Sequence, residues 1–477
     1  MSLLEKINSL LLKYGAKPVQ QIENEPKGED VIKFSKLLAD DEDQRIFLKD
    51  ALQIFESHYD SNHVEVAVIS SQLGFIEVNV GNYNEGKNYL LNAIRIYRDQ
   101  EGSFVNLKLA EALTRLGVVY IFLDDHKKAN EVLDKALPIV QEHWNSEDIH
   151  AAETLFSLGV AFGDLGNHQQ QKQLLEQALP VIESHYGSDN IEFAMKLANL
   201  AAAYVFLDNH RKSKELLQRA LPIVEQQFDK NGPDIAEALA NFGVVYGALG
   251  QHDKEIELLE RALSYFENSF GEEHVKVSVT LTNLAFSYGA KGDYLKERDI
   301  LERVLCLNET IYGPEHSEVG KSLVNLGVVC GTLEDHHRKK DLLEKALKIL
   351  EKNLGRENLE SAETTVCLAA AYRDLDDRYT EIKLLEKAIA LFEKFYSSDH
   401  IQVVETKVKL GLAYGALDDK KKQNELLRSC LPLIQEHYGP KHALVEIIQQ
   451  ALESTTDATD SASNNRRFYH KLCCTIS

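Results

Sequence analysis

The last four residues of the sequence carry its most distinctive chemistry. The chain ends Cys474-Thr475-Ile476-Ser477, which fits the C-a-a-X pattern. In that pattern the cysteine thiolate is alkylated by an isoprenoid, and a terminal serine favours a farnesyl group. The alternative is an unmodified cysteine pair in a frayed tail. We expect Cys474 to be lipidated.

A second membrane signal should accompany a farnesyl group, because one such chain anchors a protein only weakly. Cys473 is available for acylation, and Arg466, Arg467 and Lys471 are attracted to anionic lipid. Prenylation is eukaryotic machinery. We therefore expect a cytoplasmic protein, peripheral on the cytosolic face of a membrane, that is either eukaryotic or a bacterial effector acting in a host cell. The alternative is a soluble, unlipidated structural repeat array.

Seventeen histidines raise the question of a metal site. Five of them recur in one register, at His126, His168, His210, His252 and His336. Side chains in successive repeats would lie about 10 Å apart, whereas imidazoles that share a zinc ion lie about 2 Å from it. The full nucleotide-binding loop GxxxxGK[ST] is absent, because Asn88 follows the only GxxxxGK match at residues 81–87, and HExxH and GxSxG motifs are absent from the sequence. We expect no metal, no cofactor and no catalytic residue, with an enzyme site hidden in the repeats as the remote alternative.

A repeating frame must position all of these residues. A small residue follows a leucine or phenylalanine at Gly74, Gly117, Gly159, Ala201, Gly243, Ala285, Gly327, Ala369 and Gly411. One spacing is 43 residues and the others are 42. This period indicates a solenoid, in which each repeat buries its apolar face against its neighbours.

Each repeat has the pattern of two helices. In residues 191–207, apolar side chains recur every three or four positions, and residues 210–228 repeat the pattern after a break at Asp208 and Asn209. The sequence thus predicts an all-α fold of antiparallel helix pairs. Pro138, Pro180, Pro222 and Pro432 lie inside second helices, where we expect kinks or irregular turns.

The domain organisation follows from the same register. Residues 61–440 should form nine 42-residue units, preceded in residues 1–60 by a capping helix and a degenerate first hairpin. Residues 441–453 should form a C-terminal capping helix, and residues 454–477 a disordered tail.

Two of the units show a family resemblance. Residues 273–305 (EHVKVSVTLTNLAFSYGAKGDYLKERDILERVL) and residues 315–355 resemble the long tetratricopeptide repeats of kinesin light chain and nephrocystin-3. The resemblance implies a right-handed superhelical solenoid whose first helices line a concave face. It also implies a non-enzymatic adaptor that binds a protein or peptide ligand there.

A ladder of residues stands two positions before the small residue of each first helix: Gln72, Arg115, Ser157, Asn199, Asn241, Asn283, Asn325, Cys367 and Lys409. By resemblance, the asparagines bind the backbone of an extended peptide, and an amide can do so because it both donates and accepts hydrogen bonds. Alternatively, they bond the neighbouring helix. The candidate peptide-binding residues are Asn199, Asn241, Asn283, Asn325, Arg115, Lys321, Arg373 and Lys409.

The charge balance restricts the class of partner. In 477 residues, 53 Lys and Arg stand against 75 Asp and Glu, a net charge of −22. A nucleic-acid binder needs clustered cations to neutralise phosphates, so we expect no nucleic-acid partner. The acidic balance favours basic partners weakly and leaves the oligomeric state open.

Overall fold

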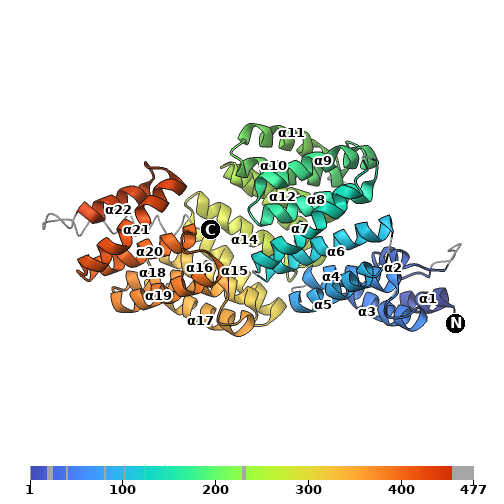
Figure 1. Cartoon of the computed structure of the whole chain (residues 1–477), viewed down its shortest axis with the longest axis horizontal. Coiled ribbons are helices and arrows are strands. Elements are labelled where there is room, and N and C mark those ends of the chain that lie inside the picture. The colour runs from blue at the N-terminus through green and yellow to red at the C-terminus, as the bar shows by residue number, and fades with distance from the viewer. Residues whose placement is uncertain are drawn as a thin grey trace. The chain divides into compact units, whose positions relative to one another are not determined.

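The computed structural model describes residues 2–14, 16–18, 25–38, 41–79, 82–100, 102–123, 125–145, 147–227 and 233–453. These residues form 22 α-helices and no strand (Figure 1). The predicted all-α fold is confirmed. The chain divides into unit 1, Met1–Leu249, and unit 2, Gly250–Ser477.

Unit 1 begins with three helices, which are followed by alternating first and second helices of the repeats. The initial helices are α1 (Leu3–Lys13), α2 (Gly28–Ser35) and α3 (Asp41–His58). The first helices are α4 (Val64–Asn79), α6 (Ser103–Phe122), α8 (Ile149–Asp164), α10 (Ile191–Phe206) and α12 (Pro233–Ala248). The second helices are α5 (Tyr83–Arg98), α7 (His126–Glu142), α9 (His168–Tyr186) and α11 (His210–Gln227).

Unit 2 continues the alternation and closes with one further helix. Its first helices are α14 (Val275–Ala290), α16 (Ser317–Thr332), α18 (Leu359–Asp374) and α20 (Ile401–Ala416). Its second helices are α13 (His252–Phe270), α15 (Tyr294–Tyr312), α17 (His336–Leu354), α19 (Arg378–Phe395) and α21 (Lys420–Tyr438), and α22 (Ala443–Glu453) follows them.

Consecutive helices pack against each other, and first helices also contact first helices. In unit 1, α4 packs on α5, α6 on α7, α8 on α9 and α10 on α11, while α6 also contacts both α4 and α8. In unit 2 the same pairing joins α14 to α15, α16 to α17, α18 to α19 and α20 to α21. Further contacts between first helices join α10 to α12 in unit 1 and α16 to α18 in unit 2.

The ladder of small residues lets the two helices of a pair approach closely. A Cβ atom added at Gly74 of α4 would lie 2.8 Å from Cγ of Leu90 in α5. One added at Gly411 of α20 would lie 3.0 Å from Cδ2 of Leu427 in α21. Both distances are shorter than ordinary carbon contacts, so the absent side chain makes room for a leucine of the second helix.

Hydrogen bonds between tyrosine and glutamate join successive pairs. Each runs from the tyrosine hydroxyl of a first helix to the glutamate of the preceding second helix. The distances are 2.9 Å for Tyr288 and Glu260, 2.6 Å for Tyr372 and Glu344, and 2.7 Å for Tyr414 and Glu386. The bond to Glu344, together with burial, raises the pKa of Tyr372 to about 12.

The second helices run without interruption through their prolines. Pro138, Pro180, Pro222 and Pro432 lie inside α7, α9, α11 and α21. The prediction of irregular turns is therefore wrong, whereas a kink at these prolines stays a prediction. Each of these helices packs along its partner first helix, and this tertiary packing outweighs the hydrogen bond that proline removes.

Apolar faces of short helices pack against both ends of the repeats. In α1, Leu3, Ile7 and Leu11 are buried, and the helix packs on α3. In α22, Leu444 and Ile448 are buried against α21 and α20. Within the described ranges, no helix has the length and apolarity needed to cross a membrane. Residues 454–477, including Cys473 and Cys474, lie outside the described residues.

Candidate functional site

All eight candidate peptide-binding residues lie on first helices. In unit 1, Arg115 lies on α6, Asn199 on α10 and Asn241 on α12. In unit 2, Asn283 lies on α14, Lys321 and Asn325 on α16, Arg373 on α18 and Lys409 on α20. The 42-residue register therefore places them on the same kind of helix in both units.

The asparagine amides differ in their hydrogen bonds. Asn199 donates from Nδ2 to the carbonyl oxygen of Met195, at 3.3 Å, within its own helix. Asn241 is exposed, and Asn283 and Asn325 are half-buried. Among the described residues, these three amides form no hydrogen bond with a neighbouring helix, so their donors and acceptors are available to a ligand.

The cations of unit 2 are engaged in ion pairs. Lys321 Nζ lies 3.0 Å from Oε1 of both Glu318 and Glu360, which joins α16 to α18. Burial lowers the pKa of Lys321, but the two carboxylates outweigh it and the pKa is raised. Arg373 lies 3.1 Å from Asp374. Both cations are therefore less suited to direct ligand contact than predicted. The third candidate cation of unit 2, Lys409, is half-buried.

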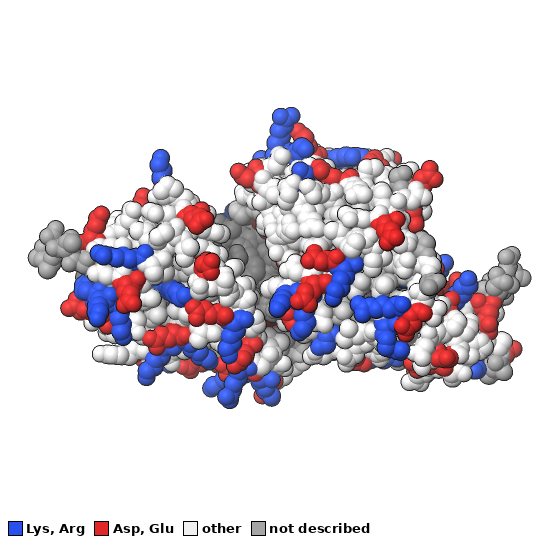
Figure 2. Space-filling model, viewed as in Figure 1, with Lys and Arg blue, Asp and Glu red and all other residues white. Residues whose placement is uncertain are grey.

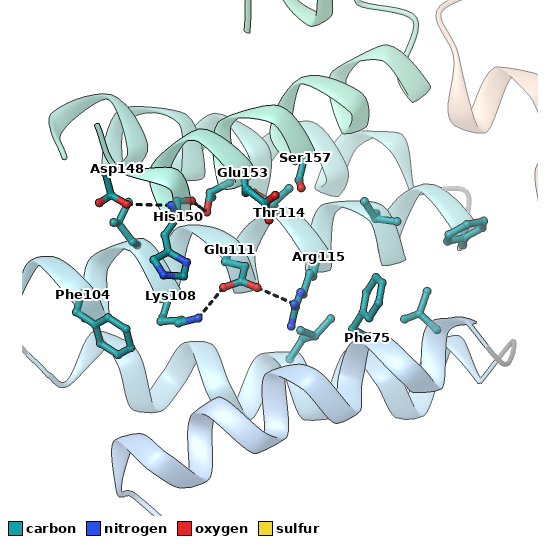
Figure 3. A pocket seen from close by; sticks show the side chains of 16 residues that line it. Phe75, Phe104, Lys108, Glu111, Thr114, Arg115, Asp148, His150, Glu153 and Ser157 are labelled. Atoms are coloured by element: carbon teal, nitrogen blue, oxygen red, sulfur yellow. Dashed lines mark hydrogen bonds and ion pairs between the residues drawn. The ribbon is translucent and has the colours of Figure 1, made fainter. Parts of the chain in front are cut away.

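A pocket of about 530 Å³ opens on the first helices of unit 1 (Figure 3). It brings together Arg115 and Ser157 of the predicted ladder. Its walls come from α4, α5, α6 and the start of α8, and they comprise Phe75, Val78, Leu90, Phe104, Leu107, Lys108, Glu111, Thr114, Arg115, Val118, Phe122, Asp148, His150, Glu153, Thr154 and Ser157.

A carboxylate between two cations lies in this pocket. Glu111 Oε2 is 3.3 Å from Lys108 Nζ, and Glu111 Oε1 is 2.6 Å from a terminal nitrogen of Arg115 (Figure 3). Burial raises the pKa of Glu111, but Arg115 and Lys108 outweigh it and hold the pKa below its ordinary value. Glu111 is therefore ionised at neutral pH, and it compensates charge on both cations.

Arg115 also ties α6 to α4. Its guanidinium donates to the backbone oxygen of Ser71 at 3.1 Å and to Oγ of Ser71 at 3.2 Å. It lies over the ring of Phe75, 5.0 Å from the centroid. Arg115 thus has a structural role that the sequence did not indicate, and its ligand contact stays a prediction.

Three phenylalanines leave apolar surface open at the pocket. Phe75 is 41% exposed, Phe104 52% and Phe122 53%. Lys108 lies 5.6 Å from the ring centroid of Phe104, and Phe122 stacks on Tyr83 with centroids 5.2 Å apart. Exposed rings that line a concave site are typical of ligand-binding surfaces.

Two carboxylates of the α8 segment form the opposite side. Asp148 precedes the helix and accepts from the backbone N–H of His150, at 2.9 Å through Oδ1. Glu153 accepts from the hydroxyl of Tyr186, at 3.0 Å through Oε1. The second oxygen of each carboxylate has no hydrogen-bond partner in the part of the chain that the structure describes.

The sequence reasoning missed most of this pocket, although the period contains a signal for it. Acidic residues stand six positions before the small residue in five repeats: Glu111, Glu153, Glu237, Glu363 and Glu405. Apolar side chains stand one position after it, including Phe75, Val118, Val244, Phe286 and Val328. These positions share a helix face with the asparagine ladder, because residues three and four apart are neighbours on a helix.

The histidine ladder lies at the beginnings of second helices. His168 Nδ1 lies 3.1 Å from Oε1 of Gln171, and His252 Nδ1 lies 2.9 Å from Oε2 of Glu255. Both contacts are local to one helix. In the described ranges, no three His, Cys, Asp or Glu side chains are grouped as a metal site requires.

Comparison with known proteins identifies the repeat. The tetratricopeptide repeat family matches residues 65–142, 192–268 and 276–352. A search of curated protein sequences gives no match.

Solved structures show similar repeats at low identity. A kinesin light chain structure from Podosopora anserina with nearly identical TPR-like repeats is 23% identical, covers 43% of this chain and 96% of its own, and has a TM-score of 0.39. The quorum sensor NprR from B. thuringiensis is 18% identical, with coverages of 75% and 99% and a TM-score of 0.49. A STAND protein with a tetratricopeptide repeat sensor from Pyrococcus horikoshii is 13% identical, with coverages of 95% and 70% and a TM-score of 0.49.

Proposed function

We propose that this chain, which carries tetratricopeptide repeats, is a non-enzymatic scaffold that binds an extended peptide or protein segment on its first helices. The pocket formed with α4, α6 and α8 is the observation that carries the proposal. It combines exposed aromatic rings with charged groups in about 530 Å³. Pockets with mainly apolar walls and a few placed polar groups are those that hold ligands.

The asparagine ladder supports the same proposal outside the pocket. The amides of Asn241, Asn283 and Asn325 form no hydrogen bond among the described residues. An extended peptide presents backbone N–H and C=O groups whatever its side chains, and an amide can pair with both. The ladder would therefore supply affinity that is independent of ligand sequence.

Peptide selection tests this function directly. A library of random peptides is selected on the full chain, and the affinity of the enriched peptides is measured for a double variant of unit 2, Asn283→Ala with Asn325→Ala. We expect the double variant to weaken binding by about tenfold, which corresponds to about 1.4 kcal/mol. The melting temperature should change by no more than about 2 °C, because these amides bond no neighbouring helix among the described residues.

A matched control is Asn268→Ala, which removes an exposed asparagine from the second helix α13. It should leave peptide affinity unchanged. If the double variant loses folding stability as much as affinity, the asparagines are structural. If no peptide binds the full chain, the proposed function is wrong.

Lipid attachment at Cys474 stays a prediction of the sequence. With it we propose a cytoplasmic location at a membrane surface, in a eukaryotic cell or in a host cell that receives the protein. Mass spectrometry of the C-terminal peptide from protein made in eukaryotic cells tests it. We expect a farnesyl group on Cys474 and loss of residues 475–477. An unmodified Cys474 with Ser477 retained would contradict the prediction.

A further inference from the structure

We infer that the pocket of unit 1 selects a peptide that carries a large apolar side chain and, two or three residues away, a lysine or arginine. The inference rests on the proposed function and names the chemistry of its ligand. It follows from which charged side chains of the pocket already have a partner of opposite charge and which do not.

The apolar requirement comes from the exposed phenylalanines. Phe104 and Phe122 are each more than half exposed, at 52% and 53%, although both line a concave site. A cation covers part of Phe104, and Tyr83 stacks on Phe122. The two rings stand at opposite ends of α6, about 27 Å apart at the rise of an α-helix, so one ligand side chain reaches only one of them. An aromatic or long aliphatic side chain packed on Phe104 would remove the remaining apolar surface of that ring from water.

The cations of the pocket are already paired with carboxylates. Lys108 Nζ lies 3.1 Å from Oε1 of Glu29 and 3.3 Å from Oε2 of Glu111. Arg115 shares Glu111 and donates its other hydrogen bonds to α4. An acidic peptide would have to compete with these carboxylates for both cations.

The negative charges of the carboxylates on the α8 side are less fully neutralised by neighbouring groups than the charges of the pocket's cations are. Asp148 uses Oδ1 for backbone N–H groups, and Glu153 uses Oε1 for the hydroxyl of Tyr186. Lys196 Nζ lies 3.9 Å from Oε1 of Glu153, and the same ammonium lies over the ring of Phe156, 4.7 Å from the centroid. The second oxygens of Asp148 and Glu153 therefore suit a guanidinium or ammonium of the ligand.

Helix spacing sets the distance between the two features. Phe104 belongs to the first turn of α6, whereas Asp148 caps α8 and Glu153 lies in the second turn of α8, and the two helices pack on each other. Packed helices lie about 8–10 Å apart, and an extended peptide rises about 3.3 Å per residue. A peptide that crosses from α6 to α8 thus spans two or three residues between its apolar anchor and its basic side chain.

Three synthetic peptides with the same glycine-serine background test the inference on the full chain. Their cores are Phe-Ala-Ala-Arg, Phe-Ala-Ala-Glu and Ala-Ala-Ala-Arg, each carries a fluorescent label, and binding is measured by anisotropy. We expect the first peptide to bind at least about tenfold more tightly than the other two. Equal or tighter binding of the Phe-Ala-Ala-Glu peptide would overturn the inference.

Two substitutions assign the preference to the pocket. Glu153→Lys should weaken the Phe-Ala-Ala-Arg peptide about tenfold and strengthen the Phe-Ala-Ala-Glu peptide, whereas Phe104→Ala should weaken both. The control Glu131→Lys makes the same charge change at an exposed position of α7 and should change neither. An effect of Glu131→Lys equal to that of Glu153→Lys would show a general charge effect and overturn the inference.

The two proposals fail in different ways. If library peptides bind through Asn283 and Asn325 but none of the three synthetic peptides binds, the function stands and the inference is wrong. If neither the library nor the synthetic peptides bind, both are wrong.

Discussion

Glu297 of α15 is a carboxylate whose usual partner is missing. In α13 and α19 of unit 2 the equivalent position is also an acid, which pairs with the first residue of its helix. Glu255 lies 2.9 Å from His252, and Glu381 lies 3.0 Å from Arg378. Tyr294 occupies the partner position for Glu297, and burial raises the pKa of Glu297 from 4.5 to about 7.

This shift makes the stability of unit 2 depend on pH. Below pH 4.5 both the folded and the unfolded carboxyl are protonated. As the pH rises toward 7, the unfolded chain releases its proton while the folded chain keeps it, so the free energy of unfolding falls. Glu297→Gln should therefore stabilise unit 2 by about 1–2 kcal/mol at pH 8 and by almost nothing at pH 4.

Urea unfolding of the full chain at both pH values measures this difference. The control Glu273→Gln removes an exposed carboxylate of the same unit and should show no pH-dependent gain. A gain for Glu297→Gln that is the same at pH 4 and pH 8 would contradict the assignment.

The turn that connects the first helix of a pair to the second has the same structure in several repeats. A residue with left-handed backbone ends the first helix, and the Asp or Asn after it caps the second. Glu334 has φ 65° and Gly292 has φ 84° at the equivalent position. The side chain of Asp335 accepts from the backbone N–H of Arg338 at 3.2 Å. The side chain of Asp293 accepts from the backbone N–H of Lys296, also at 3.2 Å.

Glu334 is therefore in a conformation that favours glycine. Glu334→Gly should raise the free energy of unfolding of unit 2 by about 0.5–1 kcal/mol, because the left-handed conformation costs an L-residue about 1–2 kcal/mol. The opposite substitution, Gly292→Ala, should lower it by about 1 kcal/mol. Chemical denaturation of both variants checks the sign, and a loss of stability on Glu334→Gly would refute the explanation.

Positively and negatively charged side chains are mixed along the repeats. On the face seen in Figure 2, Lys and Arg are interspersed with Asp and Glu. Ion pairs join successive second helices of unit 2, at 2.7 Å for Arg303 and Glu267 and 2.8 Å for Lys387 and Glu351. The net charge of −22 is thus a property of the solvated surface and gives only weak information about partners.

Stability in such a chain should be local, because a repeat contacts mainly its neighbours. Leu427 of α21 is fully buried, in a cluster with residues of α20 and α22. Leu427→Ala should cost about 2–5 kcal/mol and speed hydrogen exchange in α20, α21 and α22. Exchange in α4 and α5 of unit 1 should not change.

Hydrogen-exchange mass spectrometry separates these regions by peptide. The control Leu295→Ala removes a side chain that is 58% exposed and should change exchange nowhere beyond its own turn. An equal loss of protection in α4 and α21 on Leu427→Ala would show one cooperative unit and contradict local stability.

The sequence by itself determined the helix pairs and the face that carries the candidate residues. The 42-residue register and the periodicity of residues 191–207 and 210–228 predicted α10 and α11 to within one residue at their ends. Periodic patterns are local in the chain, so the sequence of each repeat predicts its two helices without any information on the tertiary structure.

Only the tertiary structure decided which of these residues form a pocket and which are already engaged. Arg115 and Lys321 look alike as cations on first helices, yet Arg115 lines a pocket and Lys321 bridges Glu318 and Glu360. Phe75 and Glu153 meet at one site although 78 positions separate them (153 − 75). A ligand site depends on distances between side chains of different helices, and those distances are set by packing, which sequence spacing does not encode.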